Sequence, residues 1–236
     1  MIQSQLKTEN RMSKEQKFEA SPEARSKATK LRIFAWVAWI VAIAGQAYAI
    51  FNLISDDMMM WLIGAIVVIL ILAMTGSYLW KKANRLDPAS EKDTTRFFVQ
   101  NQLGAIMGVL AFLPLVILIF TDKKLSGKTK GIAGSIAVVA MAAAGITGAD
   151  FEPPSIEKYT EEINQQTEEL KQINANNDYV FWSRAGNKYH VYEDCYHIKG
   201  KNLSNGTVKE SWEQKGISEL CKTCRKRTIK ENGVIE

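Results

Sequence analysis

The hydrophobic residues of this chain are concentrated in four long runs. The runs cover residues 33–54, 58–80, 101–120 and 131–149, and none of them contains Asp, Glu, Lys, Arg or His. An α-helix needs about 20 apolar residues to cross the hydrocarbon core of a bilayer, and each run has about that length. Buried helices of a soluble protein would show shorter runs with polar faces. The pattern therefore predicts a mainly α, multi-pass protein of the cell membrane with a four-helix transmembrane bundle.

Aromatic and small residues within the runs support this interpretation. Trp61 and Trp80 bracket the second run, as expected for rings at the level of the lipid headgroups. The third run contains Gly104 and Gly108, and small residues four apart let two helix backbones approach closely. A similar stripe lies in the fourth run at Ala140, Ala144 and Gly148. Both stripes indicate packing between helices of one chain, and a homo-oligomer formed through residues 104–108 is the alternative.

Residues 1–31, before the first run, are polar and of mixed charge, with Phe18 as their only aromatic residue. This composition predicts a disordered tail. The segment is also longer than the charged region of a signal peptide, so we expect the first run to be a retained span. The formal net charge of +5 follows from basic flanks of this kind and does not by itself indicate a nucleic-acid partner.

Lys and Arg are distributed unevenly among the connections. The flank of the first run and the connection at 81–102 are rich in both, whereas residues 55–57 are Ser-Asp-Asp. Because positively charged flanks stay in the cytoplasm, we expect a cytoplasmic amino terminus and, after four spans, a cytoplasmic carboxyl-terminal region. The third connection opposes this, because the same topology places four lysines outside: Lys123, Lys124, Lys128 and Lys130. The alternative is that one of the last two runs does not cross and the carboxyl-terminal region faces outward.

Residues 150–178 are predicted to form a linker built around one helix. Pro153 and Pro154 cannot continue a helix interior, and Ser155 is a suitable residue for the start of a new helix. Apolar residues then follow heptad spacing, interrupted only by Gln166, at Ile156, Tyr159, Ile163, Leu170 and Ile173. This pattern indicates a helix that packs on the following module or lies along the membrane surface. A stalk that pairs subunits through residues 156–173 is the alternative.

Residues 179–227 are predicted to form a small α+β module, followed by a tail at 228–236. The segments 179–183 and 189–192 are rich in β-forming residues and flank Gly186-Asn187, which suits a hairpin turn. Thr207 and Glu210 have the spacing of a capping box that opens a short helix. Gly216 is placed to end that helix.

The module contains all three cysteines and both histidines of the chain. Cys221 and Cys224 form a close pair, and His190 and Cys195 can complete a tetrahedral zinc site with them. His197 competes with His190 as the fourth ligand. A disulfide with one leftover thiol is a further alternative. Because a closed site of three cysteines and one histidine leaves no position for water or substrate, the zinc ion is predicted to be structural.

The string from Gly186 to His190, followed by Cys195, the segment 207–216 and the pair Cys221 and Cys224, resembles a family of small zinc modules. These modules have a Tyr-His pair, a cysteine a few residues later and a terminal Cys-x-x-Cys. They occur in some bacterial secreted nucleases and competence-type membrane proteins, and they are similar in outline to the metal-binding domain of the alkylation-repair protein Ada. The resemblance covers about a sixth of the chain and implies ligand roles for the four residues.

This chain departs from the pattern of that family at two positions. Leu220 stands where the family often has proline, and Arg225 follows the last cysteine where the family has a proline-rich ending. The membrane part resembles uncharacterised bacterial four-span proteins, which implies no activity.

The sequence predicts a non-enzymatic membrane protein in which the zinc module docks a protein or a nucleic acid. No carboxylate is placed as a general base, so no catalytic residue is assigned. The first alternative is a nucleic-acid-handling or repair function, which would use a basic and aromatic surface made by Trp182, Tyr192, Arg225, Lys226, Arg227 and Lys230. The second is a small transporter or channel component, for which Gln46 and a kink at Pro114 are the only indications.

Overall fold

The computed structural model describes residues 17–233, which cluster into two compact units. The membrane unit consists of Lys27–Arg85 and Lys92–Pro153. The terminal unit consists of residues 17–26, Leu86–Glu91 and residues 154–233. Each unit is therefore assembled from separate stretches of the chain, and each is described by itself.

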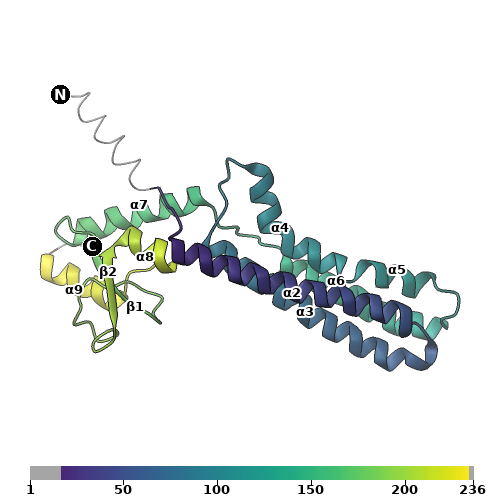
Figure 1. Cartoon of the computed structure of the whole chain (residues 1–236). Helices are drawn as coiled ribbons and strands as arrows, with labels where there is room; N and C mark the ends of the chain where they lie inside the picture. The colour runs from purple at the N-terminus through teal and green to yellow at the C-terminus, as the bar shows by residue number, and fades with distance from the viewer. Residues whose placement is uncertain (1–16, 234–236) are drawn as a thin grey trace. The chain divides into compact units, whose positions relative to one another are not determined.

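The membrane unit is built from the helices α2 to α6 (Figure 1). Their bounds are α2 Pro22–Asn52, the 3-10 turn η1 Asp56–Met58, α3 Met59–Leu86, α4 Thr94–Leu110, α5 Leu113–Thr121 and α6 Gly127–Gly148. Four helical stretches are long and apolar enough to cross a membrane: Pro22–Asn52, Asp56–Leu86, Thr94–Thr121 and Gly127–Gly148. The prediction of four membrane-length helices is confirmed, and it supports an integral membrane protein.

The first helix begins well before the predicted span. We expected residues 1–31 to be disordered; residues 1–16 lie outside the described part, but α2 begins at Pro22. Phe18 and Ala24 are buried in the core of the terminal unit, at 3% and 4% exposure. The composition was misleading because a few apolar residues in a polar segment are enough when a folded surface covers them.

The third hydrophobic run is interrupted at Ala111 and Phe112, where α4 ends and α5 begins. Pro114 lies in the first turn of α5. Proline has no backbone N–H, and the first turn of a helix is where that group has no helical partner anyway. The kink predicted at Pro114 is thus a break two residues earlier, after which the chain restarts as a separate short helix.

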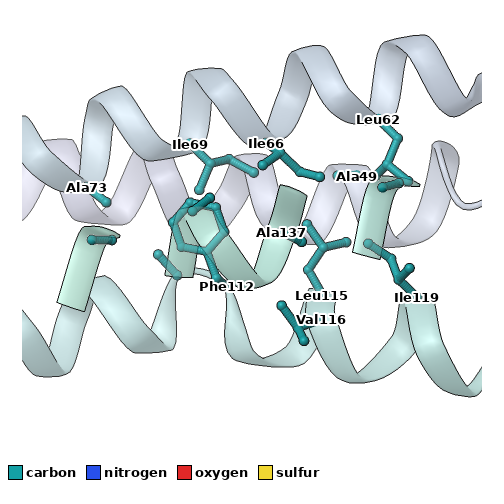
Figure 2. Packing of buried hydrophobic residues seen from close by; sticks show 14 of the residues in the cluster. Ala49, Leu62, Ile66, Ile69, Ala73, Phe112, Leu115, Val116, Ile119 and Ala137 are labelled. Atoms are coloured by element: carbon teal, nitrogen blue, oxygen red, sulfur yellow. The ribbon is translucent and has the colours of Figure 1, made fainter. Parts of the chain in front are cut away.

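The core of the membrane unit forms where α3 faces α5 and α6. Figure 2 shows Ile66 and Ile69 of α3 close to Phe112 and Leu115, and all four side chains are buried. Many other apolar side chains of the unit are exposed, including Phe34, Phe51 and Trp61. Such outward apolar faces are expected for helices whose surroundings are lipid.

The two small-residue stripes meet each other within the chain. A Cβ atom added at Gly148 would lie 2.4 Å from the backbone carbonyl carbon of Gly104, and one added at Gly108 would lie 2.7 Å from the carbonyl oxygen of Ala144. The helices α4 and α6 therefore cross with their backbones in contact. Packing within the chain was our first interpretation of these stripes, and it is what the structure has; a homo-oligomer stays a prediction.

The loops at one end of the membrane unit are joined by hydrogen bonds. Both the backbone N–H and the hydroxyl of Ser126 donate to the carboxylate of Asp56, each at 3.0 Å. The connection between α2 and α3 is therefore held against the connection between α5 and α6. Gln46, which suggested a transport role, is buried in α2 at 4% exposure, and its amide nitrogen has no hydrogen-bond partner.

The terminal unit contains α7 Ile156–Ile173, β1 Tyr179–Ser183, β2 Leu203–Thr207, α8 Val208–Lys215 and α9 Lys222–Asn232. The Ser155 side chain caps α7, and Thr207 and Glu210 form the expected capping box at α8. Gly216 ends α8 with φ of 64°, a left-handed conformation that glycine adopts at little cost. These three local predictions agree with the structure.

Two elements differ from expectation. The partner of β1 is β2, in antiparallel register from Tyr179 opposite Thr207 to Ser183 opposite Leu203. Residues 189–192 form only two isolated bridges, from Tyr189 to Leu220 and from His190 to Phe181. The segment after Cys221, expected to be a turn and a tail, is the helix α9. Both were hard to predict because β2 reads Leu-Ser-Asn-Gly-Thr and α9 is almost entirely polar.

The helix α7 packs on the module. Its buried residues Ile163, Leu170 and Ile173 join Val180 and Trp182 of β1 and Val208 and Trp212 of α8 in one cluster. Phe18, from the segment before α2, stacks edge-on against Tyr159 at 5.1 Å between ring centroids. The module therefore has a larger core than its own 179–227 segment can supply.

Candidate metal centre

His190 is held by a pair of backbone hydrogen bonds to β1. The N–H of Phe181 donates to the carbonyl of His190, and the N–H of His190 donates to the carbonyl of Phe181, both at 2.7 Å. This bridge lies close to the hairpin expected around Gly186-Asn187. It fixes the backbone of His190 and leaves the imidazole buried, with 4% exposure.

Cys221 and Cys224 occupy the start of α9. Cys221 is the N-cap residue, and Cys224 lies in the first turn. The N–H of Cys221 donates to the carbonyl of Tyr189 at 2.9 Å, which ties the start of this helix to the residue preceding His190. Residues three apart at a helix start lie on one face, so both thiols are presented to the same point.

Cys195 comes from a tight turn between the bridge and β2. Its carbonyl accepts the N–H groups of Ile198 at 2.9 Å and Lys199 at 2.8 Å, which closes a turn around the cysteine. Cys195 and Ile198 are buried in a small cluster with the other two cysteines. Three of the four buried members of this cluster are thus candidate ligands, and the hydrophobic residues packed around it are only partly buried.

The four predicted ligands converge. One atom from each of His190, Cys195, Cys221 and Cys224 lies within 4.8 Å of the other three, and all four side chains are buried. The distance from His190 Nδ1 to Cys224 Sγ is 3.6 Å. In a tetrahedral zinc site with Zn–S bonds of about 2.3 Å and a Zn–N bond of about 2.0 Å, the ligand atoms lie about 3.5 to 3.8 Å apart, so small side-chain movements would complete a zinc site. The group can therefore hold a metal ion.

The cysteines are all free thiols, so the disulfide alternative has no counterpart in this structure. His197 is exposed and does not belong to the converging group; its Nε2 lies 3.2 Å from the hydroxyl oxygen of Thr223. The geometry thus brings His190, rather than His197, to the three thiols.

The pKa values of the candidate ligands are shifted in different directions. Burial, assisted by His197 and Lys201, lowers the pKa of His190 from 6.5 to about 4, so its imidazole is neutral at pH 7. Burial acts to raise the pKa of Cys221, but the backbone amides of Cys224 and Thr223 outweigh it, and the pKa is lowered. Burial and the neighbouring Cys195 raise the pKa of Cys224 to about 12. Metal ligands must be neutral imidazole and thiolate, so Cys221 loses its proton more readily than Cys224 when a metal ion binds.

The expected basic and aromatic surface is only partly present. Trp182 is fully buried in the core of the terminal unit, so it offers no exposed ring. Arg225 pairs with Glu169 at 2.6 Å, and Arg227 pairs with Asp194 at 2.8 Å while its guanidinium stacks over the Tyr192 ring at 4.0 Å. Both arginines therefore serve contacts within the unit.

The comparisons with known proteins give no relative. No protein-family model, no curated protein and no solved structure matches this chain. The metal centre has to be interpreted from its own donor set and geometry.

One residue of structural importance was not recognised from the sequence. Gln166 interrupts the heptad spacing of α7, and its Oε1 accepts hydrogen bonds from Trp212 Nε1 at 3.0 Å and from the Tyr189 hydroxyl at 3.4 Å. The interruption itself was the available signal, because a single polar residue on an apolar helix face usually has a buried polar partner.

Proposed function

We propose that this chain is an integral membrane protein whose terminal unit is folded around a structural zinc ion and serves as a docking module. The converging, buried group of one imidazole and three thiols is the observation that carries the proposal. Soft thiolates with one imidazole suit Zn²⁺ in tetrahedral geometry. With four protein ligands the zinc ion has no open position, which favours a structural role over catalysis.

In this unit a zinc ion would connect segments that are separate in the chain. The ligands come from the β1 bridge, the turn at Cys195 and the start of α9, which are held together by the small cysteine cluster. The main core around Trp182 and Trp212 lies among α7, α8 and β1. A metal ion would join the peripheral segments to each other where apolar burial is limited.

Contacts within the terminal unit support the placement of three parts of the chain on the same side of the membrane. The N–H of Phe18, before α2, donates to the Thr160 hydroxyl at 2.9 Å. The N–H of Glu91, between α3 and α4, donates to the Glu157 carboxylate at 2.9 Å. Segments that fold into one unit lie on one side of a bilayer, so each pair of spans crosses an even number of times, which supports four crossing spans.

The α2–α3 and α5–α6 connections agree with this topology, since Asp56 of the first and Ser126 of the second are hydrogen-bonded to each other. Because the flank of α2 and the connection after α3 are rich in Lys and Arg, we infer that the terminal unit is cytoplasmic. The lysines at 123–130 would then lie outside. Fusions of green fluorescent protein and of alkaline phosphatase to the carboxyl terminus test this: fluorescence without phosphatase activity is expected, and the reverse pattern would overturn the assignment.

The metal proposal is tested on the purified full-length protein. We expect one zinc ion per chain and an X-ray absorption spectrum with three sulfur ligands at about 2.3 Å and one nitrogen at about 2.0 Å. Cys224→Ser should lose zinc, whereas the matched histidine variant His197→Ala should keep it. An oxygen ligand in the wild-type spectrum would indicate an open site and would contradict a purely structural role.

The docking role needs a separate measurement. Cross-linking in intact cells, followed by mass spectrometry, compares the wild-type protein with Cys224→Ser at equal expression. We expect specific cross-links from the 179–227 surface that disappear in the variant. Identical cross-links in both proteins, with zinc absent from the variant, would argue against a role for the folded module in docking.

A further inference from the structure

A pocket of about 450 Å³ opens beside the metal centre in the terminal unit. Its wall is contributed by three parts of the module: the loop after β1, the turn that follows Cys195, and the first turn of α9. The ligand residues His190 and Cys221 form its inner side. The pocket is therefore continuous with the metal centre, because two of the four candidate ligands belong to its wall.

The wall of the pocket is basic. Lys188, Lys201 and Lys222 line it, and no Asp or Glu is among its lining residues. Lys188 forms an ion pair with Glu219, which lies outside the pocket wall. Lys201 Nζ donates to the backbone carbonyl of His197 at 2.8 Å, which brings its ammonium group to the turn. Lys222 is exposed, and its charge helps to lower the pKa of Glu219, but it forms no direct ion pair with any residue in the described part of the chain.

The net charge around the pocket stays positive when the charge of the metal centre is included. A zinc ion with three thiolates and a neutral imidazole carries one negative charge, and Glu219 adds a second. The three positive charges of the lysines exceed these two negative charges, so the pocket attracts an anion. Thr223 adds a hydroxyl and Asn187 a side-chain amide to the same wall, and both can donate hydrogen bonds.

We propose that this pocket binds a phosphate ester, with Lys201 and Lys222 as the principal charged contacts. Several ammonium groups with hydroxyl and amide donors are the chemistry that recognises a phosphate group. The volume exceeds that of a phosphate ion alone, so the attached group has room. The phosphate is either that of a free small ester or the terminal phosphate of a nucleic-acid strand. The site stands whether or not the module also docks a protein.

The experiment uses the zinc-loaded full-length protein in a neutral detergent and measures binding by calorimetry at low salt. The probes are inorganic phosphate, adenosine 5′-monophosphate, and a short single-stranded oligonucleotide with and without a 5′-phosphate. We expect saturable binding of the phosphorylated probes that weakens as salt is raised. Equal affinity for the mononucleotide and the phosphorylated oligonucleotide assigns a small ester, and stronger binding of the oligonucleotide assigns a strand end.

A matched pair of variants distinguishes binding in the pocket from general attraction to the positive charge of the unit. The pocket variant is Lys201→Gln with Lys222→Gln, and the control is Lys226→Gln with Lys230→Gln, two exposed lysines of α9 outside the pocket. We expect the pocket variant to bind about tenfold more weakly or worse and the control to stay within about twofold. Equal losses in both, or no saturable binding by the wild type, would overturn the proposal.

Zinc content is measured for every variant, because loss of the metal would change the pocket indirectly. If the double pocket variant loses zinc, the single variant Lys222→Gln replaces it, since this lysine is exposed and has no direct ion pair in the described residues. A zinc-loaded Lys222→Gln protein with wild-type affinity would then contradict the assignment. Failure of phosphate binding with intact zinc leaves the metal proposal unaffected.

Discussion

The side-chain amide oxygen of Gln166 on α7 accepts a hydrogen bond from the indole N–H of Trp212 on α8, at 3.0 Å. The same oxygen accepts the Tyr189 hydroxyl at 3.4 Å. Tyr189 directly precedes the predicted ligand His190. One polar side chain thus connects the helix that leads into the module with the segment that carries the metal centre.

Replacement of Gln166 by leucine is expected to destabilise the terminal unit. The change leaves the buried Trp212 N–H and Tyr189 O–H without their partner, and an unsatisfied buried donor costs about 1–3 kcal/mol. Thermal unfolding followed by tryptophan fluorescence measures the effect. Gln165→Leu, at an exposed neighbouring position, is the control; a similar loss in that variant would show that the effect is not due to the shared acceptor.

Bulk at Gly148 is expected to separate α4 from α6. A Cβ atom at Gly148 would lie 2.4 Å from the Gly104 carbonyl carbon, so Gly148→Leu must push the backbones apart, at a cost of about 1–3 kcal/mol or more. Gly64→Leu is the matched control, because a Cβ atom at Gly64 meets nothing within 4 Å. The midpoint of thermal unfolding in detergent should fall for the first variant only, and equal midpoints would refute the close crossing.

Chelation of the metal is expected to loosen one part of the terminal unit more than the rest. The segments around Cys195 and Cys221 belong to the small cysteine cluster, whereas Ile163, Trp182 and Trp212 belong to the larger apolar core. Hydrogen exchange should therefore speed up by about tenfold or more around the cysteines, while α7 and α8 keep most of their protection. Uniform loss across the unit would mean that the core cannot persist without metal.

The pH dependence of zinc affinity should come from the thiols. Burial raises the pKa of Cys224 to about 12, so its proton must leave when zinc binds near pH 7, and affinity therefore rises with pH. His190, with a pKa lowered to about 4, is already neutral and releases no proton in this range. Competition with a chelator of known affinity between about pH 5.5 and about pH 8 measures the slope. A change of slope near 6.5 would indicate a histidine with an ordinary pKa as the ligand.

The spans and the ligand set were accessible from the sequence because each rests on a local signal. Uncharged runs of bilayer length and the Cys-x-x-Cys spacing do not depend on the rest of the fold. The capping residues Ser155, Thr207 and Gly216 are local signals as well. For that reason the spans and the caps agree with the structure, and the four predicted ligands lie together in it, whereas zinc binding stays a prediction.

The remaining features depend on contacts between distant segments. Nothing near Leu203 marks its strand, which exists because β1 offers a free edge. Phe18 looked like part of a disordered tail because its partner Tyr159 is far away in the chain. The pocket beside the metal centre likewise combines Lys188, Lys201 and Lys222, which come from two loops and the first turn of α9 and which only the fold brings together.

The terminal unit draws on residues before the first span, between the second and third spans, and after the fourth. Chains are made from the amino terminus onward, and compact units form when their last segment appears. The contact between Phe18 and Tyr159 therefore forms only after every membrane helix has been synthesised. Assembly of this unit therefore cannot be completed before the chain that follows the fourth span has been synthesised.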